Sequence, residues 1–314
     1  MLTRRHIRVK VMQCIYAITL SKDGSLEQQQ KFLNQSIAQT YTLYILILAL
    51  LKELQHLASQ HAEQASRKYI KTPSETQVSP LRLSENRVLL QLAENTKLTK
   101  AIDQRGLKQW YLNEKYVKIL LGDILGSELY RAYAEKPSNY ENDREFLIRA
   151  YREIIAPNDK IYEFLEDEGI TWIDDLPLIN TYLLKQLRKV KPNTPDSFFL
   201  PPLLKNKEDM DFAADLLKKA LLKAEELEGE IEGKTPNWDK ERIAELDGIL
   251  LKMAIAELLY FSSIPERVTI NEYLEIAKEY STPKSSVFIN GVLDKLIKEY
   301  EASGRLKKTG RGLL

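Results

Sequence analysis

The 314-residue sequence contains one cysteine, Cys14, and three histidines. A single cysteine excludes a disulfide within the chain and is compatible with a reducing compartment, so we expect a cytoplasmic protein. His56 and His61 are five residues apart and therefore do not share a helix face as paired metal ligands do. We interpret them as surface residues and predict neither a metal site nor a cofactor.

The sequence also lacks a strong net charge and a long apolar run. Lysine and arginine total 46 against 45 acidic residues, so a nucleic-acid-binding surface, if there is one, must be local. The longest apolar run, residues 41–51, is shorter than the roughly 20 residues that a membrane span needs, so we predict a buried helix there. The basic start MLTRRHIRVK is not followed by a signal-type apolar block. We therefore expect a soluble protein without a membrane partner.

The short motifs that carry catalysis are missing as well. The sequence has no G-x-S-x-G, Walker or H-E-x-x-H pattern and no glycine-rich cofactor loop. Seven acidic residues and one lysine lie between Asp159 and Asp175, but they lack the ligand order and central glycine of an EF-hand. We interpret them as a solvated face, and we predict that the protein is not an enzyme and has no small-molecule substrate.

What the chain does have is a series of amphipathic helices, of which residues 3–20 form the first. Its apolar stripe consists of Ile7, Val11, Cys14, Ile15 and Ile18. Basic residues surround the other sides, and no acidic residue occurs between Met1 and Lys22. Cations at a helix N-terminus oppose the helix dipole, which is a small argument that they serve a ligand outside the helix. Residue physics alone favours a solvated face and a phosphate-binding surface equally.

Prolines divide the rest of the chain. Residues 25–69 are predicted to form one or two long helices, whereas residues 191–206 carry four prolines and are predicted to be an extended linker. We place the main boundary there, between an N-terminal helical region, residues 1–206, and a C-terminal helical domain, residues 207–314. The final stretch, residues 302–314, has four basic residues, three glycines and no acid, and we expect it to be flexible.

The most informative stretch is residues 265–294, PERVTINEYLEIAKEYSTPKSSVFINGVLD. Asn271 is a candidate N-cap for a helix over residues 272–280, and Thr282-Pro283 ends that helix. A small polar turn follows. The inner face of a second helix is then marked by Phe288, Ile289, Val292, Leu293 and Leu296.

This stretch, preceded by a helix of the type Asp247–Leu258, resembles the C-terminal signature of the NusB family of bacterial transcription antitermination factors. The N-terminal run RRHIR, residues 4–8, followed by Gln13 and Tyr16, is similar to the arginine cluster and Q..Y pattern of that family. In the family this pattern lies on the RNA-binding surface.

The resemblance covers residues 3–35 and 207–298, so the chain is identified as a long NusB with a large helical insertion. It implies an all-α fold of NusB-like helical bundles, enlarged by additional helices in the N-terminal half. It also implies a factor that binds the boxA element of rRNA transcripts together with NusE, a small-subunit ribosomal protein. That complex acts with RNA polymerase in antitermination.

The resemblance also implies particular site residues. Arginines would neutralise phosphates, aromatic rings would receive unstacked bases, and the polar turn would supply hydrogen-bond donors. The predicted RNA-binding residues are Arg4, Arg5, Arg8, Gln13, Tyr16, Lys284, Ser285, Ser286 and Phe288, although periodicity alone makes Phe288 a core residue. The residues aligned with the NusE-facing region are Asp247, Leu251 and Glu257. This interpretation requires the basic helix and the turn to border one groove.

Two other functions fit the sequence less fully. A helical adaptor without RNA binding would use residues 36–206 as its interaction surface. NusB-like domains also occur at the front of rRNA cytosine methyltransferases, but this chain has no second cysteine for a catalytic motif. An accessory domain of such an enzyme is therefore the less favoured alternative.

Overall fold

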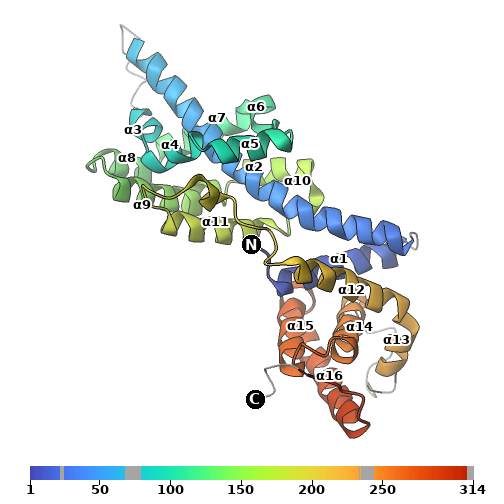
Figure 1. The fold of residues 1–314 in the computed structure, drawn as a ribbon. Coiled ribbons are helices and arrows are strands. Elements are labelled where there is room, and N and C mark those ends of the chain that lie inside the picture. Colours follow the sequence, from blue (N-terminus) through green and yellow to red (C-terminus); the bar gives the residue numbers. More distant parts are fainter. Residues whose placement is uncertain (22–24, 68–78, 233, 235–243, 310–314) are drawn as a thin grey trace. The chain divides into compact units, whose positions relative to one another are not determined.

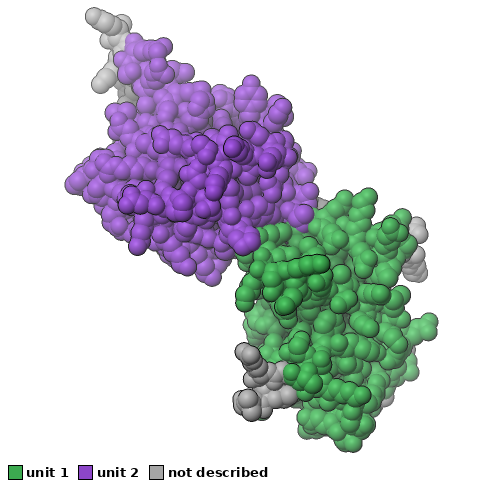
Figure 2. Space-filling model, viewed as in Figure 1, with its two compact units in different colours: residues 1–37, 203–314 green, residues 38–202 purple. Residues whose placement is uncertain are grey.

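The structure is a computed structural model that describes residues 1–21, 25–67, 79–232, 234 and 244–309 (Figure 1). This part of the chain forms helices and no strand, which confirms the predicted all-α class. The chain divides into two compact units (Figure 2). Unit 1 comprises residues 1–37 and 203–314, and unit 2 comprises residues 38–202.

Unit 1 is a bundle built from both ends of the sequence. Its helices are α1 (Arg4–Ser21), the start of α2 (Leu26–Arg67), α12 (Lys207–Leu222), α13 (Ala224–Ile231), α14 (Glu245–Tyr260), α15 (Glu266–Tyr280) and α16 (Ser285–Ala302). The first helix packs against α12, α14 and α15, and α14 also contacts α13 and α16. Residues Ile249 to Leu258 of α14 are buried except for Lys252, so this helix is covered on nearly all sides and forms the centre of the bundle.

The two units differ in one respect from the division drawn from the sequence. Their boundary at residues 202 and 203 lies close to the predicted linker, but residues 1–37 belong to the same unit as the C-terminal helices. The reason is the apolar stripe of α1. Ile7, Val11 and Cys14 have no exposed surface, because α12 and α14 cover this face of the helix.

Unit 2 consists of the second part of α2 and a set of shorter helices. These are α3 (Leu81–Ser84), α4 (Arg87–Ala93), α5 (Thr96–Gln104), α6 (Gln109–Leu112), α7 (Glu114–Gly126), α8 (Glu128–Ala134), α9 (Tyr140–Ala150), a π-helical turn (Tyr151–Ile155), α10 (Asp159–Glu168), a 3₁₀ turn (Ile170–Trp172), α11 (Leu176–Lys189) and a second 3₁₀ turn (Asp196–Phe199). Asparagine caps begin four of the helices, since side-chain oxygens of Asn86, Asn95, Asn139 and Asn158 accept hydrogen bonds from first-turn amides.

A buried carboxylate joins four elements of unit 2. Asp143 of α9 has no exposed surface and accepts hydrogen bonds from the Arg82 guanidinium at 2.7 Å and from the Tyr133 hydroxyl at 2.9 Å. The backbone amide of Arg87 donates to its other oxygen at 3.1 Å. Because the carboxylate is paired and fully hydrogen-bonded, its burial is tolerated and it fixes α3, α4, α8 and α9 relative to one another.

The apolar run predicted to be buried lies in α2. This helix has 42 residues, and by length and composition alone it is the one helix among the described residues that is long and apolar enough to cross a membrane. Of its most apolar window, 67% is buried inside the protein. That degree of burial is typical of a core helix, as the sequence analysis expected.

One local prediction near the end of the chain was wrong. The helix expected at residues 272–280 begins at Glu266, with Pro265 in extended conformation as its N-cap residue, so Asn271 lies inside the helix. Of the stretch 302–314, which was expected to be flexible, residues 310–314 lie outside the described residues. Residues 305–309 form hydrogen bonds with the rest of unit 1 and are here called the return segment. The carbonyl of Tyr300 accepts the amides of Arg305 and Leu306, so the chain turns back directly after α16.

Candidate nucleic-acid interface

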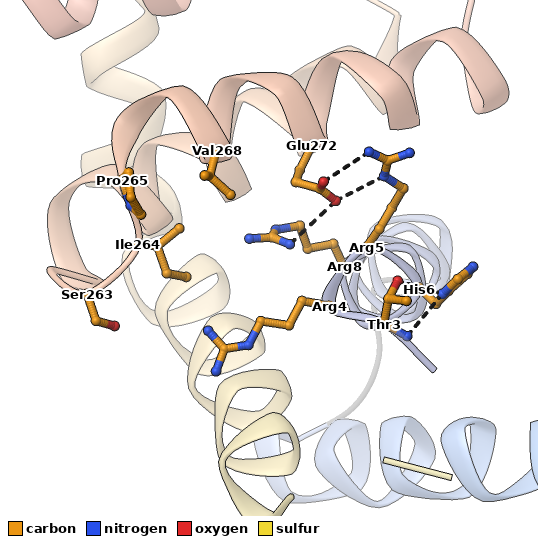
Figure 3. A pocket seen from close by; sticks show the side chains of 10 residues that line it. All are labelled: Thr3, Arg4, Arg5, His6, Arg8, Ser263, Ile264, Pro265, Val268 and Glu272. Atoms are coloured by element: carbon orange, nitrogen blue, oxygen red, sulfur yellow. Dashed lines mark hydrogen bonds and ion pairs between the residues drawn. The ribbon is translucent and has the colours of Figure 1, made fainter. Parts of the chain in front are cut away.

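The first turn of α1 and the connection between α14 and α15 border an open pocket of about 590 Å³ (Figure 3). One wall comes from α1, and the opposite wall comes from residues 263–265 and the first half of α15. The lining residues are Thr3, Arg4, Arg5, His6, Arg8, Ser263, Ile264, Pro265, Val268 and Glu272. The pocket therefore joins the two sequence regions that carry the family resemblance.

Arg4 and Arg5 are the accessible cations of this pocket, with side chains 40% and 39% exposed. Arg4 donates one hydrogen bond from Nε to Asp209 at 3.2 Å, and its guanidinium lies over the Phe212 ring at 5.1 Å. Its two terminal nitrogens have no partner among the residues that the structure describes.

Arg5 is held more firmly than Arg4. Its Nε and one terminal nitrogen donate to the two oxygens of Glu272 at 3.0 and 2.9 Å. These hydrogen bonds are the largest cause of the raised pKa of Arg5. One terminal nitrogen is left for a ligand, which makes Arg5 a fixed donor at the edge of the pocket (Figure 3).

Arg8 has a different role from its neighbours because it is buried. Its side chain is 2% exposed and donates to both oxygens of Glu257 at 2.8 and 2.6 Å. The guanidinium also lies 5.1 Å from the Phe212 ring centre and 5.8 Å from that of Tyr273. Arg8 thus fixes α1 to α12, α14 and α15, and its prediction as a direct phosphate ligand is corrected to a structural role.

The partner of Arg8 is fully satisfied. Glu257 has no exposed surface, and its carboxylate accepts additional hydrogen bonds from Thr269 at 2.8 Å and from the Tyr273 hydroxyl at 3.2 Å. Burial, followed by the charge of Glu257, holds the pKa of Tyr273 well above its usual value, so the phenol stays protonated and donates. Four donors on one carboxylate satisfy its lone pairs, which is the condition for a stable buried charge.

His6 reinforces the start of α1. The Thr3 backbone amide donates to His6 Nδ1 at 3.1 Å, and the Thr3 hydroxyl lies 2.8 Å from the same nitrogen. Burial and the neighbouring charge of Arg5 lower the pKa of His6 from 6.5. A neutral imidazole accepts the hydrogen bond from the Thr3 amide, so His6 orders the helix start. Arg4 and Arg5 are then the charged residues of this turn that a ligand can reach.

The polar turn after α15 does not belong to this pocket. It follows the C-terminal end of α15, whereas the pocket borders the first half of the same helix, and the 15 residues of α15 extend about 22 Å. No residue from 284–288 lines the pocket. The arginines and the turn therefore do not share one pocket in the described part of the chain.

Within the turn, only some predicted side chains are accessible. Lys284 is exposed and Ser286 is half-buried, whereas Phe288 is 8% exposed and belongs to the core, as its periodicity indicated. Ser285 is 1% exposed and its hydroxyl donates to Asp247 at 2.7 Å. Ser285 and Phe288 are thus corrected from RNA contacts to structural residues.

On the other turns of α1, Tyr16 is 39% exposed and Gln13 is half-buried. Tyr16 presents an accessible ring on the helix that also carries Arg4 and Arg5. Of the predicted Q..Y pair, only Tyr16 has an aromatic ring, and this ring is suited to stacking on a base.

The residues predicted to face NusE are buried. Asp247 is 2% exposed and accepts hydrogen bonds from Ser281 at 2.6 Å and from Ser285, while Leu251 and Glu257 have no exposed surface. None of the three can itself contact a partner in this structure. Their alignment with a partner-facing helix reflects the packing of α14, the most buried helix of unit 1.

Three site residues escaped the sequence analysis: Asp209, Glu272 and Phe212. They neutralise or cover the arginines of α1, although they lie more than 200 positions away in the sequence. The pairing of Glu272 with Arg5 joins residues 267 positions apart and had no local signal in the sequence. No group of His, Cys, Asp and Glu side chains suited to a metal ion occurs among the described residues.

Comparison with known proteins finds relatives of part of this chain. The NusB family model matches residues 182–298. Transcription antitermination protein NusB of Salinibacter ruber is 45% identical over 113 residues, which cover 36% of this chain and 71% of that protein. The proteins of the same name from Chloroherpeton thalassium and Clostridium botulinum are 41% and 42% identical over 33% and 28% of this chain, and 49% and 63% of their own lengths.

No solved structure matches the chain. The names of these relatives describe transcription antitermination proteins and not enzymes, in agreement with the sequence prediction. The matched residues carry α14, α15 and the Pro265–Glu272 wall of the pocket. On this evidence the chain belongs to the NusB family.

Proposed function

We propose that the protein is a cytoplasmic transcription antitermination factor that binds boxA-type single-stranded RNA of rRNA transcripts together with NusE, within the RNA polymerase antitermination complex. Family membership and the names of the relatives support this proposal. The observation that carries it is the pair of exposed guanidinium groups at the pocket: Arg4 and Arg5 keep unoccupied N–H donors beside a space of about 590 Å³.

The pocket binds the phosphates of single-stranded RNA and not those of a duplex. Phosphate oxygens accept hydrogen bonds from the terminal nitrogens of Arg4 and from the remaining one of Arg5. Asp209 and Glu272 hold the two side chains in place until a phosphate competes for them. An unpaired strand brings its phosphates into a concave site between two walls more easily than a helical duplex does, because its backbone bends freely.

Other exposed residues of unit 1 extend the surface. The ring of Tyr16 offers a stacking face for an unpaired base, and Lys284 and Ser286 offer donors at the far end of α15. Gln13 remains a candidate contact beside Tyr16. Arg8 supports this surface indirectly, because it fixes the helix that carries Arg4 and Arg5.

A binding measurement with matched variants tests the proposal. Arg4→Ala/Arg5→Ala removes two phosphate contacts. For single strands, each lost contact makes the slope of log affinity against log salt concentration shallower by about 0.7. Over the decade between 1 M and 0.1 M salt, this amounts to roughly 25-fold weaker binding at 0.1 M. The same measurement with NusE present is expected to give tighter binding and the same difference between variants.

The matched control is Arg149→Ala/Arg152→Ala in unit 2. These arginines are 46% and 52% exposed, and both pair with Glu153, so the control removes the same charge from an equally exposed position. The control is expected to bind boxA RNA as the parent does. If the Arg4/Arg5 variant also binds as tightly as the parent, the pocket is not an RNA site.

One observation favours a second function, a protein-binding adaptor. In unit 2, Tyr111 and Leu112 of α6 are 77% and 71% exposed, which is unusual for adjacent large apolar side chains. An adaptor of this kind would show negligible affinity for boxA RNA with or without NusE. It would lose its protein partner in the variant Tyr111→Ser/Leu112→Ser.

A further inference from the structure

The return segment, residues 305–309, packs against the connection between α14 and α15. The Thr309 backbone amide donates to the carbonyl of Ser262 at 2.9 Å. The Lys308 ammonium donates to the carbonyls of Glu257 and Phe261, both at 3.1 Å. These carbonyls lie at the C-terminal end of α14, where a cation is favoured by the helix dipole.

The other end of the segment is also fixed. Arg305 donates to both oxygens of Glu230 at 3.2 and 2.7 Å, and its guanidinium lies over the Tyr300 ring at 4.8 Å. Residues 305–309 are therefore anchored at Arg305 and at Thr309. Five residues anchored at both ends have a defined course over the surface of unit 1.

Between these anchors, Lys307 is exposed and forms no ion pair or hydrogen bond with any residue that the structure describes. It differs in this from Arg305 and Lys308, whose charges are used within the protein. The ammonium group of Lys307 has no partner within the described residues and can therefore pair with a ligand. Because the backbone around Lys307 is already fixed, binding there costs little backbone entropy.

The return segment and the arginine pocket both border the short connection between α14 and α15. Ser262, the acceptor for Thr309, directly precedes Ser263, Ile264 and Pro265, which form a wall of the pocket. Three residues extend at most about 10 Å, so the return segment is a close neighbour of that wall. Arg4 and Arg5 stand on the opposite wall.

We infer that the return segment extends the RNA-binding surface, with Lys307 contacting a phosphate beyond those held by Arg4 and Arg5. This inference rests on the proposed function. A single strand of RNA that occupies the pocket would pass over the Ser262–Pro265 connection and reach Lys307. The segment thereby sets a minimum length for a fully bound strand, because a short strand fills the pocket without reaching Lys307.

Length-dependent binding of RNA tests this inference. For a boxA RNA extended on both sides, Lys307→Ala is expected to reduce affinity about 5-fold at 0.1 M salt and the salt slope by about 0.7, as for one phosphate contact. For a boxA RNA shortened from both ends past the length at which the parent itself loses about 5-fold in affinity, the same variant is expected to bind as the parent does, because this RNA no longer reaches residue 307. Lys298→Ala, at an exposed lysine of α16, is the matched control and should change neither.

A second measurement locates the RNA directly. Cys14 is fully buried, so Lys307→Cys introduces a single accessible thiol for a photo-crosslinking label. We expect crosslinks to the extended RNA from position 307 and none from the control Lys298→Cys.

The outcomes separate this inference from the proposed function. If Arg4→Ala/Arg5→Ala weakens binding but Lys307→Ala changes nothing at any RNA length, the return segment is not an RNA contact and the proposed function stands. If neither variant alters binding, the proposed function itself fails. If Lys307→Ala lost the same affinity for short and for extended RNA, the inference that only a longer strand reaches Lys307 would be contradicted.

Discussion

Replacement of Arg8 by methionine should destabilise unit 1, although two neighbouring arginines in the sequence, Arg4 and Arg5, are exposed. The variant removes the fork that Arg8 makes with Glu257 at 2.8 and 2.6 Å and leaves a fully buried carboxylate. Breaking a buried pair from one side costs about 3–5 kcal/mol. Because Thr269 and Tyr273 still donate to Glu257, we expect the lower end, about 3 kcal/mol.

The only cysteine of the chain provides the assay. Cys14 lies on the same helix as Arg8 and has no exposed surface, and burial raises its pKa to about 12. It therefore reacts with a thiol reagent only when α1 is released, because the thiolate is the nucleophile. A loss of about 3 kcal/mol increases the open population, and with it the reaction rate, roughly 100-fold.

Arg5→Met is the matched control, since it removes an arginine from the same helix. Arg5 is 39% exposed, and an exposed ion pair contributes about 1 kcal/mol or less, so the rate should rise less than about 5-fold. Glu257→Gln should accelerate the reaction as Arg8→Met does, because it leaves the cation buried without its counter-charge. If Arg8→Met reacts no faster than Arg5→Met, the assignment of Arg8 to the core is refuted.

Three further predictions concern single side chains. Burial lowers the pKa of His6, so the stability that neutral His6 contributes is present above pH 6.5 and is lost as the pH falls through the lowered pKa. Urea midpoints measured between pH 7.5 and 5 should show this loss of stability, and the variant His6→Gln should not show it. Glu272→Gln frees Arg5 from an ionic partner and should raise RNA affinity a few-fold, whereas unchanged or weaker binding would show that Glu272 does not compete with phosphate. Asp143→Asn leaves the largely buried guanidinium of Arg82, 12% exposed, without its counter-charge and should destabilise unit 2 by about 3 kcal/mol, measured from the denaturant midpoint of tryptophan fluorescence. A loss below about 1 kcal/mol would contradict the role of the Asp143 carboxylate.

Periodicity predicted the helices well, because a buried stripe is a local property of the sequence. Ile7, Val11 and Cys14 were assigned to an inner face, and all three are fully buried. The same reasoning failed at the start of α15, where the exposed Val268 interrupts the apolar pattern. Pro265, which fits a helix start, was the better signal there.

The roles of the charged residues could not be predicted in the same way. Arg4, Arg5 and Arg8 look equivalent in the sequence, yet their exposed fractions range from 40% to 2%. The difference depends on the acid that each one meets, and Glu257 lies 249 positions from Arg8. A motif therefore indicates that such residues matter, while the tertiary structure decides which of them a ligand can reach.

The composition of unit 1 from residues 1–37 and 203–314 has a consequence for synthesis on the ribosome. The apolar stripe of α1 is made first, but its cover on α12 and α14 follows only after about 165 intervening residues. At ordinary elongation rates this delay is on the order of 10 s, long enough for unit 2 to complete its own packing. For that interval the apolar stripe of the nascent α1 is without the two helices that cover it in the folded protein.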